Sequence, residues 1–234
     1  MAFTYCNLTI KINVDIWQRG LRVLFATAHC RTRNHATKCQ LFSALCVTCK
    51  FKYQLYNLFM KKYKDKIAYI HKSLGISNLY SNEFGLTLQY EETDLVDIGI
   101  DVFGRPQRLG VLASEAWKLM HINAKDENVI LNVVSAFRSV EKQIEIIKRK
   151  VEDGQSLVNI LKVSAAPGYS EHHTGRALDI TTEGSEPLSE SFENTEAFQW
   201  LQENAHLHHF RLSYPKDNKF GIAYEPWHWA YVGV

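Results

Sequence analysis

The stretch Ser170-Glu-His-His-Thr-Gly-Arg-Ala-Leu-Asp179 places an imidazole, His172, and a carboxylate, Asp179, seven residues apart. A later segment, Glu225-Pro-Trp-His228, adds a second imidazole and a carboxylate three residues before it. A catalytic zinc ion needs three protein ligands, an open position for water and a base that takes the proton of that water. Together the two segments supply these groups, and they therefore indicate a zinc peptidase.

The first segment also predicts how the fold presents its carboxylate. Arg176-Ala-Leu-Asp-Ile-Thr-Thr182 is typical of a strand, in which successive side chains point to opposite faces. Asp179 then lies on the face opposite Leu178 and Ile180, where an active-site cleft could use it. Gly175 allows a tight backbone turn just before the strand.

The second segment provides a candidate base. Pro226 stiffens the backbone between Glu225 and His228. Trp227 and Trp229 would bury the other face of a strand and keep the local dielectric low. In those surroundings Glu225 is a candidate general base for a zinc-bound water. One such histidine or carboxylate is commonly just a solvated surface group, but two clusters of this composition argue for a shared site.

A third candidate is the cation Arg138, which follows the apolar segment 128–134. That segment is rich in β-branched residues and predicts a central strand. A lone cation beside a buried strand is costly unless it meets an anion, and a guanidinium can bind a carboxylate or stabilise an oxyanion. Gln143 lies five residues further on and is expected to face the same pocket. A structural pair between Arg138 and a glutamate is the alternative.

The remaining periodicity predicts a mixed chain of helices and strands. Ser139 is expected to cap the helix that follows Arg138, and Asn194 is expected to cap the last helix. The predicted helices cover 62–73, 110–123, 140–151, 156–162 and 194–204. The predicted strands cover 95–102, 128–134, 176–182, 210–213 and 227–232.

The chain changes character near Met60. Residues 1–59 carry eight lysines and arginines against the single acid Asp15, and they hold all five cysteines, Cys6, Cys30, Cys39, Cys46 and Cys49. Cys46-Val-Thr-Cys49 has the spacing of a zinc knuckle or redox pair, but no second pair accompanies it. We interpret 1–59 as a basic N-terminal extension: a targeting segment, a poorly ordered stretch, a tether to an anionic surface, or a segment not made if synthesis starts at Met60. Residues 60–234 are expected to form the zinc peptidase domain.

Other classes of protein lack their signatures here. The chain contains no HExxH, P-loop or Rossmann glycine pattern, and Ser170 lacks the second glycine of a nucleophile elbow. No apolar run approaches the ~18 residues of a membrane span. The net charge of +2 says little by itself, and we expect no nucleic-acid partner.

In the segments around Arg138, His172 and His228, the chain resembles the zinc D-alanyl-D-alanine carboxypeptidases of the VanY type. These belong to a wider group with lysostaphin-like peptidases and the hedgehog signalling domain. Two departures alter details of the pocket: His173 stands where the family often has glutamine, and Ala230 where it usually has arginine. The resemblance covers about 95–233 and rests on Ser135-Ala-Phe-Arg-Ser139, Gln143, Pro167-Gly-Tyr-Ser-Glu-His-His-Thr-Gly-Arg-Ala-Leu-Asp-Ile180, Ser213-Tyr-Pro215 and Tyr224-Glu-Pro-Trp-His-Trp-Ala-Tyr-Val-Gly233.

The resemblance implies an α+β fold, in which a small central antiparallel sheet carries the zinc site and helices pack on one side. It implies one Zn²⁺ per chain, held by His172, Asp179 and His228, with Glu225 as the catalytic base. Arg138 would steady the substrate carboxylate or the tetrahedral intermediate. The residues that would contact substrate are Arg138, Gln143, Ser170 and Trp227.

The function implied is a metallocarboxypeptidase that removes the C-terminal D-alanine of peptidoglycan stem peptides or muropeptides, with a D,D bond preferred. An L,D-carboxypeptidase or an endopeptidase on the same substrates is the first alternative, and a non-catalytic zinc-binding module is the second. We expect a monomer. It would act in the cell envelope or periplasm if 1–59 direct export, and in the cytoplasm if the chain starts at Met60.

Overall fold

The structure is a computed structural model that describes residues 14–15, 22–23 and 35–233, with side chains from residue 54 to residue 233. Its contacts divide the chain into two parts, Met1–Met60 and Lys61–Val234. None of the described helices combines the length and the apolar character needed to cross a membrane.

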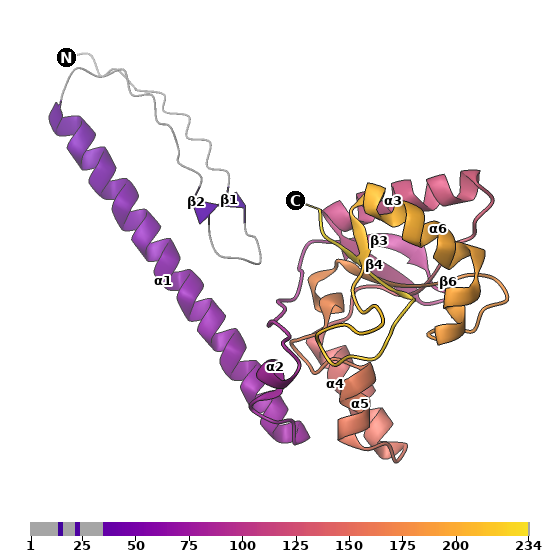
Figure 1. Cartoon of the computed structure of the whole chain (residues 1–234). Helices are drawn as coiled ribbons and strands as arrows, with labels where there is room; N and C mark the ends of the chain where they lie inside the picture. The colour runs from indigo at the N-terminus through magenta and orange to yellow at the C-terminus, as the bar shows by residue number, and fades with distance from the viewer. Residues whose placement is uncertain (1–13, 16–21, 24–34, 234) are drawn as a thin grey trace. The chain divides into compact units, whose positions relative to one another are not determined.

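The N-terminal part contains a short antiparallel pair, β1 (Val14–Asp15) and β2 (Arg22–Val23). Helix α1 (His35–Leu74) begins in this part and continues into the next (Figure 1). The sequence predicted only its last stretch, 62–73, and assigned no element to 35–59. Residues such as leucine, lysine and glutamine sustain a helix by intrinsic propensity even where no regular apolar stripe marks it. The search for periodicity therefore missed the first half.

The cysteine site considered above falls outside the described part of the chain. Cys6 and Cys30 are not among the described residues, and neither are the side chains of Cys39, Cys46 and Cys49. A metal or redox role for them stays a prediction.

The C-terminal part is built on a four-stranded antiparallel sheet with the strand order β5-β6-β8-β7. The registers pair Asp179 with Ser135 on one side and with His228 on the other. The two segments that suggested a zinc site thus lie on neighbouring strands, and the predicted small antiparallel sheet is confirmed. The strands are β5 (Asn132–Ser135), β6 (Ala177–Thr181), β7 (Phe210–Leu212) and β8 (His228–Tyr231).

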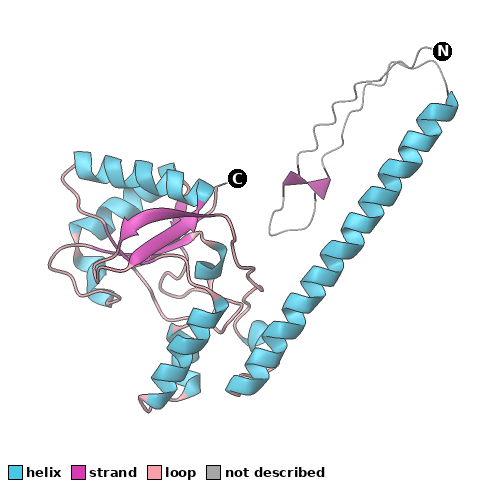
Figure 2. Cartoon of the chain, turned by 180° about the vertical axis from the view of Figure 1, so that it is seen from behind, coloured by secondary structure: helices cyan, strands magenta, loops and turns pink. Residues whose placement is uncertain are grey.

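One face of this sheet forms the main core with helices α3 (Val111–Asp126) and α6 (Glu196–Asn204) (Figures 1 and 2). Leu178 and Ile180 are fully buried there, in the same cluster as residues of both helices. Strand alternation places Asp179 on the opposite face, as the sequence predicted. The apolar face of β6 therefore anchors the strand while its polar face remains available for a site.

The apolar segment 128–134 does not form a central strand as predicted. Only its second half enters β5, which is an edge strand of the sheet. Its carbonyl groups are nevertheless satisfied, because Val102 donates its N–H to the Val133 carbonyl at 3.0 Å and Arg105 donates to the Val134 carbonyl at 3.0 Å. The apolar composition reflects burial under the segment 102–105, which covers this edge.

That covering segment belongs to a second, two-stranded sheet, β3 (Leu95–Ile100) and β4 (Pro106–Gly110). Asp101 holds its turn with four hydrogen bonds. Its carboxylate accepts the N–H groups of Phe103 and Arg105, the Arg105 guanidinium and the Gln107 amide at 2.7–3.0 Å. The side-chain amide oxygen of Gln107 in turn accepts the N–H of Ala136 at 2.9 Å. The hairpin is thereby tied to the chain that leaves β5.

The helix caps test the boundaries predicted from the sequence. Helix α4 (Val140–Glu152) begins after Ser139, whose hydroxyl accepts the Lys142 N–H at 3.1 Å, as predicted. The prediction for Asn194 is wrong, since Thr195 caps α6 instead. Asparagine and threonine are both good caps, so adjacent candidates cannot be ranked from sequence alone. The other helices are α2 (Tyr80–Glu83), α5 (Leu157–Val163), η2 (Glu190–Asn194) and η3 (Ala205–His208).

Candidate metal centre and substrate cleft

A short 3-10 helix, η1 (Glu171–Thr174), delivers the first histidine. The Ser170 hydroxyl caps it by accepting the His172 N–H at 3.3 Å. Gly175 ends it with a φ of +64°, and a Cβ atom at this position would lie 2.8 Å from the Gly110 nitrogen. Only glycine fits such a left-handed position against another backbone. The tight turn expected at Gly175 is therefore present, and it leads directly into β6.

The side chains of His172, Asp179 and His228 converge at the polar face of the sheet. One ligand atom from each lies within 4.8 Å of the others, and all three residues are buried. The His172 Nε2 atom is 3.2 Å from one Asp179 oxygen, and the His228 Nδ1 atom is 3.0 Å from the other. The three could hold one metal ion, and a set of two imidazoles and one carboxylate is of the kind that Zn²⁺ accepts.

The other nitrogen of each imidazole is also engaged. The His172 Nδ1 atom lies 2.6 Å from the Ala136 carbonyl oxygen, and the His228 Nε2 atom lies 3.0 Å from a Glu171 carboxylate oxygen. Acceptors of this kind fix a proton on the outer nitrogen and leave the inner one free to ligate. The arrangement is thus that of metal-binding histidines with their ring orientation already set.

Glu171 was not predicted as a site residue. Its only signal in the sequence is its place beside His172, and its contact is with His228 on another strand. Burial works to raise the pKa of the Glu171 carboxyl, but the hydrogen bond and charge of His228 outweigh burial, so the pKa is lowered on balance. The carboxylate form is therefore favoured where it meets the ring.

The electrostatics of the cluster favour a bound cation. Burial alone would raise the pKa of the Asp179 carboxyl, but the neighbouring His172 and His228 rings hold it well below its usual range. Burial also works against a charged His228 ring, but hydrogen bonds from Asp179 and Glu171 raise the pKa of His228 to about 10. By contrast, burial lowers the pKa of His172, which keeps that imidazole neutral. The site thus stabilises positive charge between the Asp179 and Glu171 carboxylates, a charge that a bound metal ion could supply in place of the His228 proton.

Glu225 lies beside this cluster. One of its oxygens is 3.7 Å from the His228 Nδ1 atom, and its own N–H donates to the Tyr214 carbonyl at 3.0 Å. Burial raises the pKa of the Glu225 carboxyl to about 7. A carboxyl group with such a pKa can both accept and return a proton near neutral pH.

Arg138 also reaches the cluster. Its guanidinium donates to the Ser135 hydroxyl at 3.1 Å, to the Gln143 side-chain oxygen at 3.0 Å and to Asp179 at 3.5 Å. The Gln143 amide group donates to the Ala165 carbonyl at 2.7 Å, and Gln143 is fully buried. Gln143 is therefore a buried partner of the Arg138 guanidinium, and its contact with a substrate stays a prediction.

These groups face a cleft of about 760 Å³. Trp229 is buried in the core, whereas Trp227 is half-buried and lines the cleft. His173 is fully buried, with its Nδ1 atom 2.5 Å from the Arg138 carbonyl and its Nε2 atom accepting the Gly168 N–H. The predicted site residues that line the cleft are Arg138, Ser170, His172, Asp179, Glu225, Trp227 and His228.

Comparisons with known proteins point to one family. The VanY family model, described as D-alanyl-D-alanine carboxypeptidase, matches residues 107–234. The protein YodJ of Bacillus subtilis strain 168 is 36% identical over 180 residues, which make up 72% of this chain and 64% of YodJ. The chain therefore matches less than two-thirds of the length of that relative.

Two solved structures share the fold. The LdcB LD-carboxypeptidase is 35% identical with a TM-score of 0.56, and the match covers 62% of this chain and 71% of LdcB. A mutant of the D,D-pentapeptidase VanY, solved in complex with Zn(II), is 31% identical with a TM-score of 0.50, and the match covers 62% of this chain and 81% of VanY. The family match spans more than half of the sequence and includes every residue of the candidate site. The chain belongs to the VanY family of D-alanyl-D-alanine carboxypeptidases.

Proposed function

We propose that this chain is a zinc-dependent carboxypeptidase that hydrolyses the bond before the C-terminal D-alanine of peptidoglycan stem peptides, with a D,D bond preferred. The observation that carries the proposal is the convergence of His172, Asp179 and His228 with Glu225 and Arg138 at one cleft. The Zn(II) complex of the VanY mutant supports zinc as the metal, because the two imidazoles and one carboxylate of this chain are donors that Zn²⁺ accepts.

His172, Asp179 and His228 would hold the zinc ion, which when bound supplies Lewis-acid polarisation and makes water a nucleophile near neutral pH. Glu225 would accept the proton of the attacking water and return it to the departing amine. Its pKa of about 7 suits both steps, since the carboxylate and the acid are both accessible near neutral pH.

Arg138 would act on the substrate carbonyl. Its contacts with Gln143 and Ser135 hold the guanidinium in one orientation at 17% side-chain exposure. A preorganised cation in a dry site stabilises the negative charge that develops on a carbonyl oxygen during attack. Ser170 and Trp227 line the same cleft and would contact the substrate.

An L,D-carboxypeptidase is the second candidate. LdcB and VanY are similar to this chain to nearly the same degree, and one is an LD-carboxypeptidase while the other is a D,D-pentapeptidase. The zinc ligands and the base would serve either bond, so the choice depends on how the cleft accommodates the residue before the cut.

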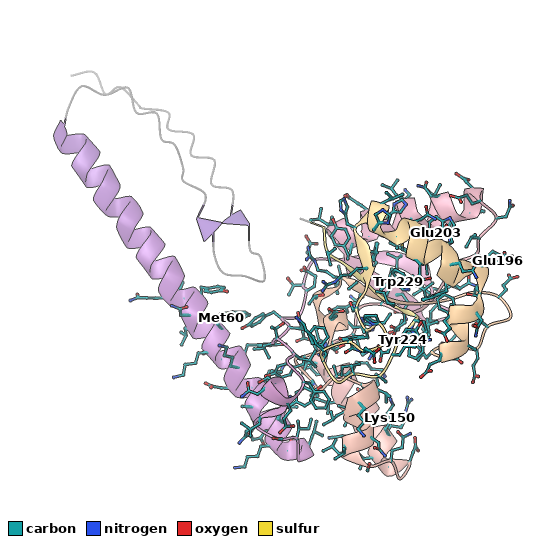
Figure 3. The ribbon with its side chains drawn as sticks, viewed as in Figure 1. Met60, Lys150, Glu196, Glu203, Tyr224 and Trp229 are labelled. Carbon is teal, nitrogen blue, oxygen red and sulfur yellow. The ribbon has the colours of Figure 1, made fainter. Side chains whose placement is uncertain are left out.

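The test measures D-alanine release from a pentapeptide and a tetrapeptide stem, in parallel, by the zinc-loaded protein. Glu225→Gln is the inactive variant, because it keeps the shape of the side chain and removes its basicity. Glu203→Gln, on the exposed surface of α6 outside the cleft, is its matched control (Figure 3). We expect release by the wild type and the control only, with about one zinc ion in all three. Absence of release from both peptides by the zinc-loaded wild type would refute the proposal.

A further inference from the structure

The segment 165–168, which leads into the zinc-site motif, contacts the last turns of helix α1. His71 is buried in those turns, and its Nε2 atom lies 2.8 Å from the Pro167 carbonyl oxygen. A carbonyl oxygen can only accept a hydrogen bond, so the His71 ring carries a proton on Nε2 and donates it to this contact. The end of α1 therefore holds the segment by a buried hydrogen bond.

Two further contacts fix segment 165–168 on the same side. Gly168 packs directly against α1: its φ is +85°, and a Cβ atom at this position would lie 2.8 Å from the Ile67 side chain. The Tyr80 hydroxyl of α2 accepts the Ala166 N–H at 2.9 Å, in a fully buried position. All of these helix residues precede the part of the chain that the VanY family model matches. The segment is therefore supported by residues that the family match does not include.

Segment 165–168 in turn holds Arg138 at two points. Its first carbonyl, that of Ala165, accepts the Gln143 amide at 2.7 Å, and the Gln143 side-chain oxygen accepts the Arg138 guanidinium at 3.0 Å. Its last N–H donates to the His173 Nε2 atom at 3.0 Å, and the His173 Nδ1 atom lies 2.5 Å from the Arg138 carbonyl oxygen. Gln143 and His173 are both fully buried. The guanidinium and the backbone of Arg138 thus depend on the same four residues.

We infer that His71 is a positioning residue for the reaction: through segment 165–168 it holds the Arg138 guanidinium in the orientation that stabilises the transition state. The inference rests on the proposed function. A cation stabilises a developing oxyanion efficiently when its donors are aimed before the reaction begins. Displacement of such a group by about 1 Å can cost about a hundredfold in rate. His71 does not line the cleft, so its effect on the substrate passes through the segment.

The experiment measures kcat, KM and zinc content for the zinc-loaded wild type, His71→Leu and His71→Gln on the stem peptide that the wild type cleaves. Leucine removes the donor, whereas glutamine can bring an amide N–H to nearly the same place. We expect His71→Leu to lower kcat by about tenfold to hundredfold, with KM and zinc content nearly unchanged, and His71→Gln to recover most of the loss. His206→Leu is the matched control, because His206 is exposed and does not line the cleft.

Two further variants separate positioning from lost stability. Tyr80→Phe removes only the hydroxyl that accepts from segment 165–168, and it should lower kcat in the same direction even if His71→Leu fails to fold. Met120→Ala removes a fully buried side chain in another part of the core, and it should lower Tm while leaving kcat unchanged below the transition. An equal loss of kcat in Met120→Ala would overturn the inference, because any destabilised variant would then behave alike.

The decisive measurement repeats His71→Leu and Tyr80→Phe in an Arg138→Lys background. Lysine keeps the charge but cannot reproduce the contacts of the guanidinium with Gln143 and Ser135. If His71 acts through Arg138, either substitution has little further effect on kcat in this background. Losses that multiply would overturn the inference while leaving the carboxypeptidase intact, and so would an unchanged kcat in both single variants. A zinc-loaded wild type that cleaves no stem peptide would refute the proposed function itself.

Discussion

Replacing Glu171 by glutamine is expected to weaken zinc binding although Glu171 is not a ligand. Its carboxylate lies 3.0 Å from the His228 Nε2 atom and fixes the proton there, which leaves the Nδ1 atom free for the metal. Glutamine keeps an oxygen that can accept the same hydrogen bond. The substitution therefore removes the negative charge and the basicity that it lends to the ring, while the side-chain length stays the same.

The magnitude follows from the geometry and burial of the pair. The His228 side chain is 4% exposed and the Glu171 side chain 22%, so their contact is only partly screened by water. Loss of such an outer partner lowers metal affinity by about tenfold to hundredfold. We expect Glu171→Gln toward the lower end, near 1.4 kcal/mol, since about 1.4 kcal/mol corresponds to a tenfold change. Glu171→Ala should lie toward the upper end, because it leaves the Nε2 proton without this acceptor.

The assay is a competition between the protein and a chelator of known zinc affinity, followed by the zinc content of the protein at equilibrium. Glu203→Gln serves as the control, since it removes an exposed carboxylate of α6 and should leave the affinity unchanged. Equal zinc affinities for the wild type and Glu171→Ala would refute the reasoning that Glu171 sets the tautomer of His228. Activity at saturating zinc would then show whether the variant loses metal or loses turnover.

Three further predictions concern stability. Asp101→Asn should lower the free energy of unfolding at pH 7 by about 1–3 kcal/mol, because an amide nitrogen would replace the buried carboxylate oxygen that accepts from the Arg105 guanidinium and the Gln107 amide. Burial works to raise the pKa of Asp101, but its hydrogen bonds with Arg105 and Phe103 lower it on balance. The contribution of Asp101 to stability is therefore present above the unfolded pKa of about 4 and is lost as the pH falls through the folded value. Urea titrations should show a smaller difference in unfolding free energy between wild type and Asp101→Asn at pH 3 than at pH 7. Gly175→Ala should destabilise the fold by about 1–2 kcal/mol or more, measured as a lower Tm, because φ is +64° and the new Cβ would meet the Gly110 nitrogen. Leu178→Ala should cost about 2–5 kcal/mol in urea unfolding, and an effect below 1 kcal/mol would contradict its place in the core.

The strand that carries Asp179 could be predicted because its signal is local. An alternation of two residues decides which side chains share a face, so Leu178 and Ile180 point to the core and Asp179 points away whatever the rest of the chain does. Its pairing with His228 is different in kind. That register depends on how β6 and β8 meet across an intervening segment that contains α6 and β7, and only the combination of ligand types suggested that they would meet.

Some features could not be predicted because they depend on which groups meet in three dimensions. The apolar composition of 128–134 indicates burial, but it does not say whether a neighbouring strand or a covering loop provides it. The spacing of Gln143 from Arg138 predicts that the two approach each other, but not that the Gln143 side-chain oxygen accepts from the guanidinium. The Glu171 carboxylate meets His228 on another strand, and no periodicity points to that contact.

The positions that the sequence did not reveal are those that orient the predicted ones. His172 is set by the Ala136 carbonyl, Ala136 by Gln107, and Gln107 by Asp101 in the turn of another hairpin. Each link is an ordinary hydrogen bond between residue types that occur throughout the sequence, so none stands out in a search for chemistry. The ligand types can be found from their spacing, but the precision of the site comes from a chain of acceptors that exists only once β3, β4 and β5 have come together. Substitution of Gln107 by leucine should therefore lower zinc affinity without touching a ligand, and an unchanged affinity in the chelator assay would show that the Ala136 carbonyl is held by its own strand alone.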